Sequence, residues 1–154
     1  MHDPRMDATD REMLRLLQRD ARLTADELGR RLGLSASQAG RRRQRLEAGP
    51  IRGYGARLDP AALGLGVQAF VQVEMARHGK DTHRAFARLV EAVPEITEAF
   101  TLTGDADYLL RVACADLAAL NRLVQERLLP HEAVGRVRSQ IVLQALKAHG
   151  PLPV

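Results

Sequence analysis

The chain has 154 residues, of which 45% are hydrophobic, 27% are charged and only 3% are aromatic. This apolar fraction is large enough to build a core, which excludes global disorder, and the length predicts one domain or two small ones. No stretch approaches the roughly 20 uninterrupted apolar residues of a membrane span, and the N-terminus lacks an apolar signal core, so we expect a soluble, cytoplasmic protein without a membrane partner. The single cysteine, Cys114, excludes an intramolecular disulfide bond and a cysteine-based zinc cluster.

The net charge of +4 is unevenly distributed along the chain. Residues 1–57 hold 13 arginines and 8 acidic residues, a balance of +5, whereas residues 58–154 have a balance of −1. A basic segment of this kind indicates contact with nucleic acid or with a membrane surface. Arg supplies nearly all of the excess, and its planar fork suits phosphates and guanine edges. The simpler alternative is a solvated basic surface.

Three short helices are predicted in this basic segment. The first spans residues 7–18, with acidic residues in its first turn, where the helix dipole favours them. A capping box, Thr24-Ala-Asp-Glu27, begins the second helix, which ends at Gly33. Another capping box, Ser35-Ala-Ser-Gln38, begins the third helix, which runs to about Ala48.

Two capped helices joined by a glycine turn are typical of a helix-turn-helix, whose second helix enters the major groove of DNA by its N-terminal part. Small polar side chains and Gln reach base edges, and Arg binds phosphate or guanine. A β-like stretch, residues 51–54, follows and is expected to form a wing. The predicted DNA-binding residues are Thr24, Ser35, Ser37, Gln38, Arg41, Arg42, Arg45 and Arg52. The alternative is an ordinary three-helix bundle with a charged outer helix.

The second part of the chain has the periodicity of a sheet with two helices. Alternating apolar and polar residues predict strands at 67–75 and 137–145. Two shorter β-type runs, residues 96–103 and 108–113, flank a tight turn. Helices are expected over residues 81–92 and from the N-cap Asp116 to Leu128.

The order βαββαβ is the ferredoxin-like arrangement, in which two helices cover one face of an antiparallel sheet. The fold class is therefore α+β, an N-terminal winged helix-turn-helix followed by a ferredoxin-like effector domain. The other sheet face carries apolar residues that no further element can cover, so we expect self-association as a homodimer or an assembly of dimers. The predicted boundaries are 1–55 for the DNA-binding domain, 56–66 for the linker, 67–148 for the effector domain and 149–154 for the tail.

The two halves of the chain also carry a recognisable set of motifs. The first half contains Asp7-x-x-Asp10, Leu14-x-x-Leu17-Gln18-x-Asp20-x-Arg22, Leu28, Gly33-Leu34-Ser35, Arg42, Leu46-Glu47 and Gly53-Tyr54, and the second half contains Gly104-Asp105-Ala106-Asp107-Tyr108-Leu109-Leu110. This pattern resembles the leucine-responsive regulator/AsnC (Lrp/AsnC) family over nearly the whole chain. Several positions depart from the family: Leu46-Glu-Ala-Gly49 has one residue before the glycine where two are usual, Gly40 stands where a larger apolar residue is common, and Arg43 stands where an aliphatic core residue is usual. The shorter stretch is expected to shift the wing by one residue. At Arg43 there are two alternatives. Either its stem snorkels from the core or the helix is slightly rotated.

The resemblance implies a sequence-specific transcriptional regulator that binds a pseudo-palindromic operator in double-stranded DNA and responds to an amino acid or similar metabolite. It also implies octamers or similar assemblies of dimers and a cytoplasmic, nucleoid-associated location. By resemblance, the effector lies between dimers and contacts Leu102, Gly104, Asp105, Asp107, Leu117, Ile141, Val142 and Leu143. Asp107 is expected to hold the α-ammonium group. Alternatively, both aspartates only cap a turn, or the amides around Gly104 bind a carboxylate.

No catalytic, metal or cofactor site is predicted. The five histidines lack i,i+3 or i,i+4 pairing, and no cluster combines a nucleophile, a base and an orienting group. Two other functions stay open. One is an architectural protein that coats DNA with little sequence preference, and the other is an enzyme resembling the sirohaem decarboxylases, which share this architecture.

Overall fold

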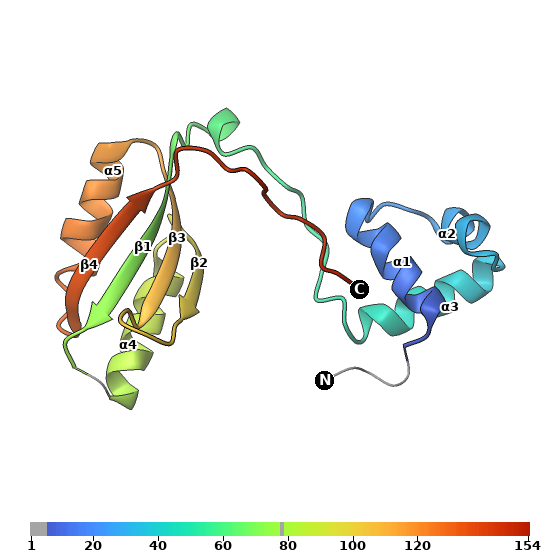
Figure 1. Ribbon diagram of the computed structural model, residues 1–154, viewed down its shortest axis with the longest axis horizontal. Coiled ribbons are helices and arrows are strands. Elements are labelled where there is room, and N and C mark those ends of the chain that lie inside the picture. The colour runs from blue at the N-terminus through green and yellow to red at the C-terminus, as the bar shows by residue number, and fades with distance from the viewer. Residues whose placement is uncertain (1–5, 78) are drawn as a thin grey trace. The chain divides into compact units, whose positions relative to one another are not determined.

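The computed structural model describes residues 6–77 and 79–154 (Figure 1). The first five residues of the predicted DNA-binding domain and His78 lie outside the described residues. The chain divides into two compact units. We call Met1–Arg57 together with Lys147–Val154 the N-terminal unit, and Leu58–Leu146 the sheet unit.

The N-terminal unit contains the three predicted helices, which are confirmed as α1 (Ala8–Arg19), α2 (Ala25–Leu32) and α3 (Ala36–Glu47). Both predicted capping boxes are present, at Thr24 and at Ser35. Met13, Leu14, Leu17, Leu23, Leu28, Ala39 and Leu46 form its core.

The turn between α2 and α3 is built on two glycines. Gly33 ends α2 with φ 67°, a left-handed conformation that favours glycine. The N–H groups of Gly33 and Leu34 both donate to the carbonyl of Gly29, which lies buried inside α2. After α3, the Ile51 N–H donates to the Leu46 carbonyl at 2.9 Å. Residues 51–59 are neither helix nor strand, so the segment expected to form a wing has no β-strand in this chain.

The sheet unit confirms the βαββαβ order. A four-stranded sheet with the order β2-β3-β1-β4 has antiparallel neighbours throughout. Its strands are β1 (Val67–Met75), β2 (Ile96–Thr101), β3 (Tyr108–Cys114) and β4 (Val134–Ile141), and its helices are α4 (Lys80–Ala92), α5 (Leu117–Arg122), a π-helical turn (η2, Leu123–Leu128) and a short 3-10 helix (η1, Ala61–Leu63). α4 and α5 lie on the same side of the sheet (Figure 1). Phe86 and Leu120 from these helices pack with Val71 and Leu110 from the strands in one core.

The last strand lies earlier in the sequence than predicted. We expected residues 137–145, whereas β4 begins at Val134 and ends at Ile141. The pairing of β4 with β1 ends at Ile141 and Ala69, and the Val142 N–H still donates to the Gln68 carbonyl at 2.9 Å. Leu143 lies beyond this last contact and is exposed.

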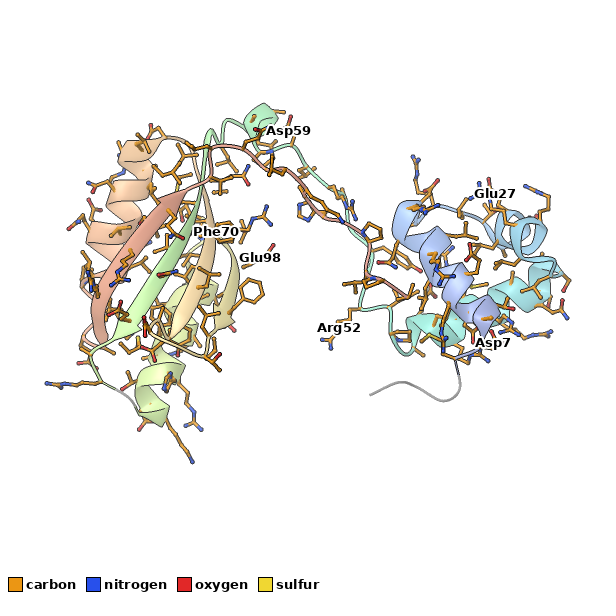
Figure 2. The ribbon with its side chains drawn as sticks, in the orientation of Figure 1. Asp7, Glu27, Arg52, Asp59, Phe70 and Glu98 are labelled. Atoms are coloured by element: carbon orange, nitrogen blue, oxygen red, sulfur yellow. The ribbon has the colours of Figure 1, made fainter. Side chains whose placement is uncertain are left out.

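The open face of the sheet is mixed rather than uniformly apolar. By register, Phe70 lies beside Arg111, and Leu109 lies beside Phe100 (Phe70 and Glu98 are labelled in Figure 2). Arg111 donates to the Glu98 carboxylate at 3.0 Å. This face therefore combines aromatic and aliphatic surface with ion pairs, a composition that suits a protein interface.

Candidate DNA and effector sites

One face of α3 gathers four of the eight predicted DNA-binding side chains. Gln38, Arg41, Arg42 and Arg45, spaced by three or four residues, line an open hollow of about 260 Å³. The opposite side of the helix is buried through Ala39 and Leu46. The hydrophobic core thus fixes which side of α3 is exposed, and that side carries three guanidinium groups.

The capping boxes use part of the polar groups expected to contact DNA. The Gln38 side-chain oxygen accepts from the Ser35 N–H at 2.9 Å, which leaves its amide NH₂ as a donor on the surface. The Ser35 hydroxyl accepts from the Gln38 N–H at 3.2 Å, and Thr24 is held in the same way by Glu27. Ser37 is exposed. Arg52 lies beyond the helix and extends away from it (Figure 2).

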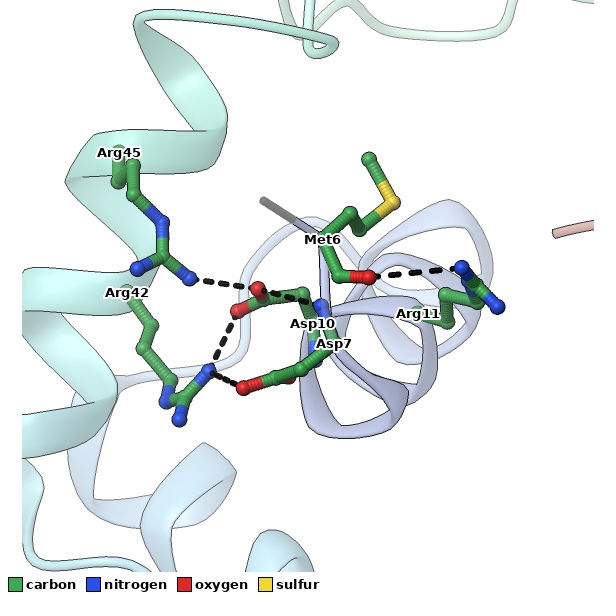
Figure 3. A network of polar contacts seen from close by, with 6 residues as sticks. All are labelled: Met6, Asp7, Asp10, Arg11, Arg42 and Arg45. Atoms are coloured by element: carbon green, nitrogen blue, oxygen red, sulfur yellow. Dashed lines mark hydrogen bonds and ion pairs between the residues drawn. The ribbon is translucent and has the colours of Figure 1, made fainter. Parts of the chain in front are cut away.

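A buried carboxylate ties α3 to α1 (Figure 3). Of the residues that the structure describes, Asp10 alone is a buried charged or polar residue, with 1% exposure. It accepts from Arg42 Nη1 at 2.8 Å and from Arg45 Nη2 at 2.5 Å. Arg42 Nη1 also donates to Asp7 at 2.7 Å. These contacts hold the guanidinium ends of two predicted phosphate-binding arginines against the first helix.

The same network shifts the ionisation of its members. The pKa of Asp7 lies below its ordinary value, first because the Asp10 backbone N–H donates to it and then because Arg42 does. The bonds to Asp7 and Asp10 raise the pKa of Arg42. Arg42 therefore stays charged while it is bound to two carboxylates. The neighbouring Arg41 side chain is exposed to solvent.

Arg43 has a structural role that replaces the usual aliphatic contact. Its guanidinium donates to the carbonyl oxygen of Leu23 at 2.7 Å and to the Glu47 carboxylate at 2.8 Å. It also lies over the ring of Tyr54, 5.2 Å from the centroid, and the Tyr54 hydroxyl donates to Glu47 at 2.9 Å. Of the two explanations considered, the structure supports a stem that leaves the core, with the charged end joining α3 to the α1–α2 turn and to the segment after α3.

We predict that this cluster weakens in acid. The pKa of Glu47 is lowered, first by the Arg43 hydrogen bond and then by that of Tyr54. A carboxylate with a depressed folded pKa contributes stability above its unfolded value, about 4.3, and loses it as the pH falls through the folded pKa. Between about pH 5 and pH 3, the urea midpoint should therefore fall less for Glu47→Gln than for the wild-type chain. Glu12→Gln, which removes an exposed pair with Arg15, is the control. Equal acid losses in wild type and Glu47→Gln would contradict this prediction.

The predicted effector residues of the β2–β3 turn lie at the C-terminal end of β1. The Asp107 N–H donates to the Val73 carbonyl at 3.0 Å, and its carboxylate accepts from the Met75 N–H at 2.7 Å. The Asp107 side chain thus continues the β1–β3 hydrogen bonding past the last paired residues. In the same turn, Gly104 has φ 118° and Leu102 is 37% exposed.

The other predicted effector residues lie at the opposite end of β1. Ile141 pairs with Ala69, and Cys114, which precedes Leu117 by one short turn, pairs with Val67. A strand rises about 3.3 Å per residue, so the two groups of candidates are separated by more than about 10 Å along the sheet. The described part of one chain therefore does not bring all eight residues into one pocket.

The remaining candidate features are a metal site, a membrane-spanning helix and the single thiol. Residues 6–77 and 79–154 contain no group of three potential metal ligands. None of the described helices is both long enough and apolar enough to cross a membrane. Cys114 is buried, and burial raises the pKa of its thiol, which disfavours the reactive thiolate.

Both halves of the chain match profiles of known protein families. The profile of the AsnC-type helix-turn-helix domain matches residues 6–47, and that of the Lrp/AsnC ligand binding domain matches residues 68–152. The chain belongs to the Lrp/AsnC family. It is 38% identical over 143 residues to the leucine-responsive regulatory protein of Rhizobium meliloti, with 92% of each chain covered. It is 35% identical over 150 residues to that of Escherichia coli, covering 97% of this chain and 92% of the relative.

Solved structures of Lrp/AsnC proteins share the fold. A transcriptional regulator of Neisseria meningitidis, crystallised as an L-Met complex, has a TM-score of 0.91 and 41% identity, with 96% of each chain covered. An AsnC family regulator of Agrobacterium tumefaciens has a TM-score of 0.89 and 35% identity, covering 96% of this chain and 97% of that one. The chain is therefore a transcriptional regulator with a helix-turn-helix domain and a ligand-binding domain, as the resemblance implied.

The contacts of two residues of the Lrp/AsnC chain, Asp10 and Arg43, were missed by sequence reasoning. Asp10 was assigned only to the favourable end of the helix dipole, although Asp7-x-x-Asp10 has the spacing of a capping box and could have been recognised as one. The contact of Asp10 with two arginines of α3 had no local signal. The partners of Arg43 lie on the α1–α2 turn and after α3, so its spacing alone does not reveal them.

Proposed function

We propose that this Lrp/AsnC chain binds double-stranded DNA through the exposed face of α3. The observation that carries this is the basic surface of Gln38, Arg41 and Arg45 opposite a buried helix face. In a helix-turn-helix, the N-terminal part of the second helix meets base edges and the flanking residues meet phosphates. Ser37, Gln38 and Arg41 therefore read bases, while Arg42, Arg45 and Arg52 lie toward the backbone, with Ser35 and Thr24 at the helix N-termini.

We further propose that an amino acid controls this binding from the ligand-binding domain. The similar regulator of Neisseria meningitidis was crystallised with L-Met. Here Asp105 is exposed in the β2–β3 turn, whereas the Asp107 carboxylate already holds the Met75 N–H. A carboxylate is the natural partner of an α-ammonium group. We therefore assign the ammonium contact, first expected at Asp107 alone, to both aspartates. The exposed Asp105 reaches the ligand, and Asp107 contributes its second carboxylate oxygen while it fixes the turn.

The separation of the two groups of effector residues favours assembly. Leu102 and Gly104 belong to the turn group, and Leu117, Ile141, Val142 and Leu143 belong to the group at the other end of β1. A site containing both groups requires residues from more than one copy. Homodimers, assembled further into an octamer or a similar ring, provide such a site and pair the helix-turn-helix domains for a pseudo-palindromic operator. The DNA ligand implies a cytoplasmic protein associated with the nucleoid, and a regulatory rather than catalytic role.

DNA binding with and without amino acids tests this proposal. The chain is titrated on the region upstream of its own gene and on random duplex, at about 0.15 M salt, with and without a mixture of amino acids. We expect selective binding that shifts with the mixture. Gln38→Ala should lose about 1–3 kcal/mol on the selected DNA and little on random DNA. Gln125→Ala, at an exposed position of the sheet unit, is the matched control.

The outcomes separate the competing functions. Because Gln38 also caps α3, Gln38→Glu keeps an acceptor for the Ser35 N–H and shows whether the loss comes from the cap. Selective DNA binding whose affinity no amino acid changes would contradict the effector part of the proposal. Equal affinity for both duplexes would favour an architectural protein that coats DNA. No binding to either duplex would contradict the proposal and favour the enzyme resembling sirohaem decarboxylases.

A further inference from the structure

The end of the chain folds back onto the helix-turn-helix. Lys147–Val154 forms part of the N-terminal unit, although it follows β4 in the sequence (Figure 1). Gln18 of α1 makes two hydrogen bonds with one residue of this segment. Its amide NH₂ donates to the Leu152 carbonyl at 3.2 Å, and its oxygen accepts from the Leu152 N–H at 2.6 Å. The half-buried Val154 packs against the hydrophobic cluster of the three helices.

The sequence of this segment suits such docking. Pro151 and Pro153 have no N–H, so Leu152 carries the only backbone donor of the three residues. A Gln side chain has one acceptor and a donor group side by side, and therefore satisfies both backbone groups of Leu152 at once. The Leu152 side chain is 72% exposed, so the contact is made by the backbone. Flanking prolines restrict the free segment to extended conformations, which lowers the entropy lost on docking.

We call Lys147–Val154 the tail. Because the tail is docked on α1, two stretches of chain connect the units. The first is the segment that leaves α3, which Tyr54 ties to Glu47 and Arg43. The second is the segment that leaves β4 and ends at Gln18. A domain connected at two points has fewer orientations available to it than a domain connected at one. It therefore loses less entropy when it takes up a single orientation on its ligand.

We propose that the tail is a second tether between the units, and that Gln18 is the positioning residue that docks it. Paired helix-turn-helix domains then bind paired half-sites with little loss of orientational freedom. This role rests on the proposed DNA binding. It adds a determinant of affinity that lies outside the protein surface that contacts DNA. Gln18 acts through the tail and does not contact the nucleic acid. Release of the tail should therefore weaken binding to a two-half-site duplex and leave binding to a single half-site almost unchanged.

The docking is tested first without DNA. In the full-length chain, the Leu152 amide should exchange with solvent about tenfold more slowly than in Gln18→Ala, as expected for a contact of two modest hydrogen bonds. Gln18→Glu keeps the acceptor and loses the donor, so its exchange rate should lie between the two. The control Gln125→Ala should exchange like wild type. A Leu152 amide that exchanges equally fast in wild type and Gln18→Ala would overturn the docking, whether or not the chain binds DNA.

The tethering is tested with DNA that the wild-type chain selects from a random-sequence library, and with either half of that duplex alone. We expect Gln18→Ala, and a chain ending at Gly150, to lose about fivefold in affinity for the full duplex and less than about twofold for the half. Circular dichroism and thermal unfolding show whether α1 is intact in each variant. Unchanged affinity for the full duplex, in a variant whose Leu152 amide exchanges faster, would overturn the tether. Failure of the wild-type chain to bind any duplex would instead overturn the proposed function on which the tether rests.

Discussion

Replacing Asp10 by Ala should lower the free energy of unfolding of the N-terminal unit by about 2–4 kcal/mol. The carboxylate is buried and accepts from Arg42, from Arg45 and from the Asp7 N–H. Its removal leaves the two guanidinium groups without their shared partner and breaks half of the capping box of α1. Hydrogen bonds to charged groups are stronger than bonds between neutral groups, which makes the loss of stability large. Because both arginines are partly exposed, new hydrogen bonds to water offset part of that loss.

Urea unfolding of the full-length chain, followed by nuclear magnetic resonance of its two tyrosines, measures this loss. Tyr54 lies in the N-terminal unit and Tyr108 in the sheet unit, so each reports one unit. Asp10→Asn keeps an acceptor for Asp7 and should lose about half as much. Asp26→Ala, in the first turn of α2 but exposed, should cost at most about 1 kcal/mol. A loss for Asp10→Ala no larger than for Asp26→Ala would mean that the network adds no stability.

The helices of this protein could be predicted closely because their limits are local. A capping box lies within four consecutive residues, so Thr24 and Ser35 identify the starts of α2 and α3 without knowledge of the tertiary fold. The same is true of Gly33, whose left-handed conformation few other residues adopt at low cost. Period-two alternation predicted β1 to the residue, because alternate residues of this central strand are buried from Ala69 to Met75.

The features that sequence did not reveal depend on distant partners. The limits of β4 follow from its pairing with β1, which ends at Ile141 and Ala69, whereas the apolar Leu143 continues the alternation in the sequence beyond that pair. The π-helical turn after α5 has no recognised pattern in the residues that form it. The predicted effector residues divide between two ends of the sheet, and this division becomes visible only once the strand register is known. The contact between Gln18 and Leu152 joins residues at opposite ends of the sequence.

The strongest steric constraint in the helix-turn-helix is the close approach of the turn to Gly29. A Cβ atom at this position would lie 2.6 Å from the Leu34 carbonyl oxygen, a distance that real Cβ contacts do not show. The obstacle is backbone, and it is held in place by the Leu34 N–H, which donates to the Gly29 carbonyl at 2.9 Å. Gly29→Ala must therefore displace the turn that sets α3 against α2. We expect a loss of about 2–3 kcal/mol in the free energy of unfolding, after the gain of about 1 kcal/mol in helix propensity is included.

Gly40 in α3 gives the matched comparison, because there the nearest atom to an added Cβ is the Ala25 Cβ at 3.9 Å, an ordinary contact. Gly40→Ala should therefore raise the free energy of unfolding by about 0.5–1 kcal/mol through helix propensity alone. The same substitution in adjacent helices thus has opposite expected signs, measured as urea midpoints followed at Tyr54. Since the displaced turn carries the N-terminus of α3, Gly29→Ala should also weaken DNA binding at temperatures where the unit is still folded. Equal effects of the two substitutions would show that the turn yields at little cost, and that its close approach to α2 does not fix the position of the recognition helix.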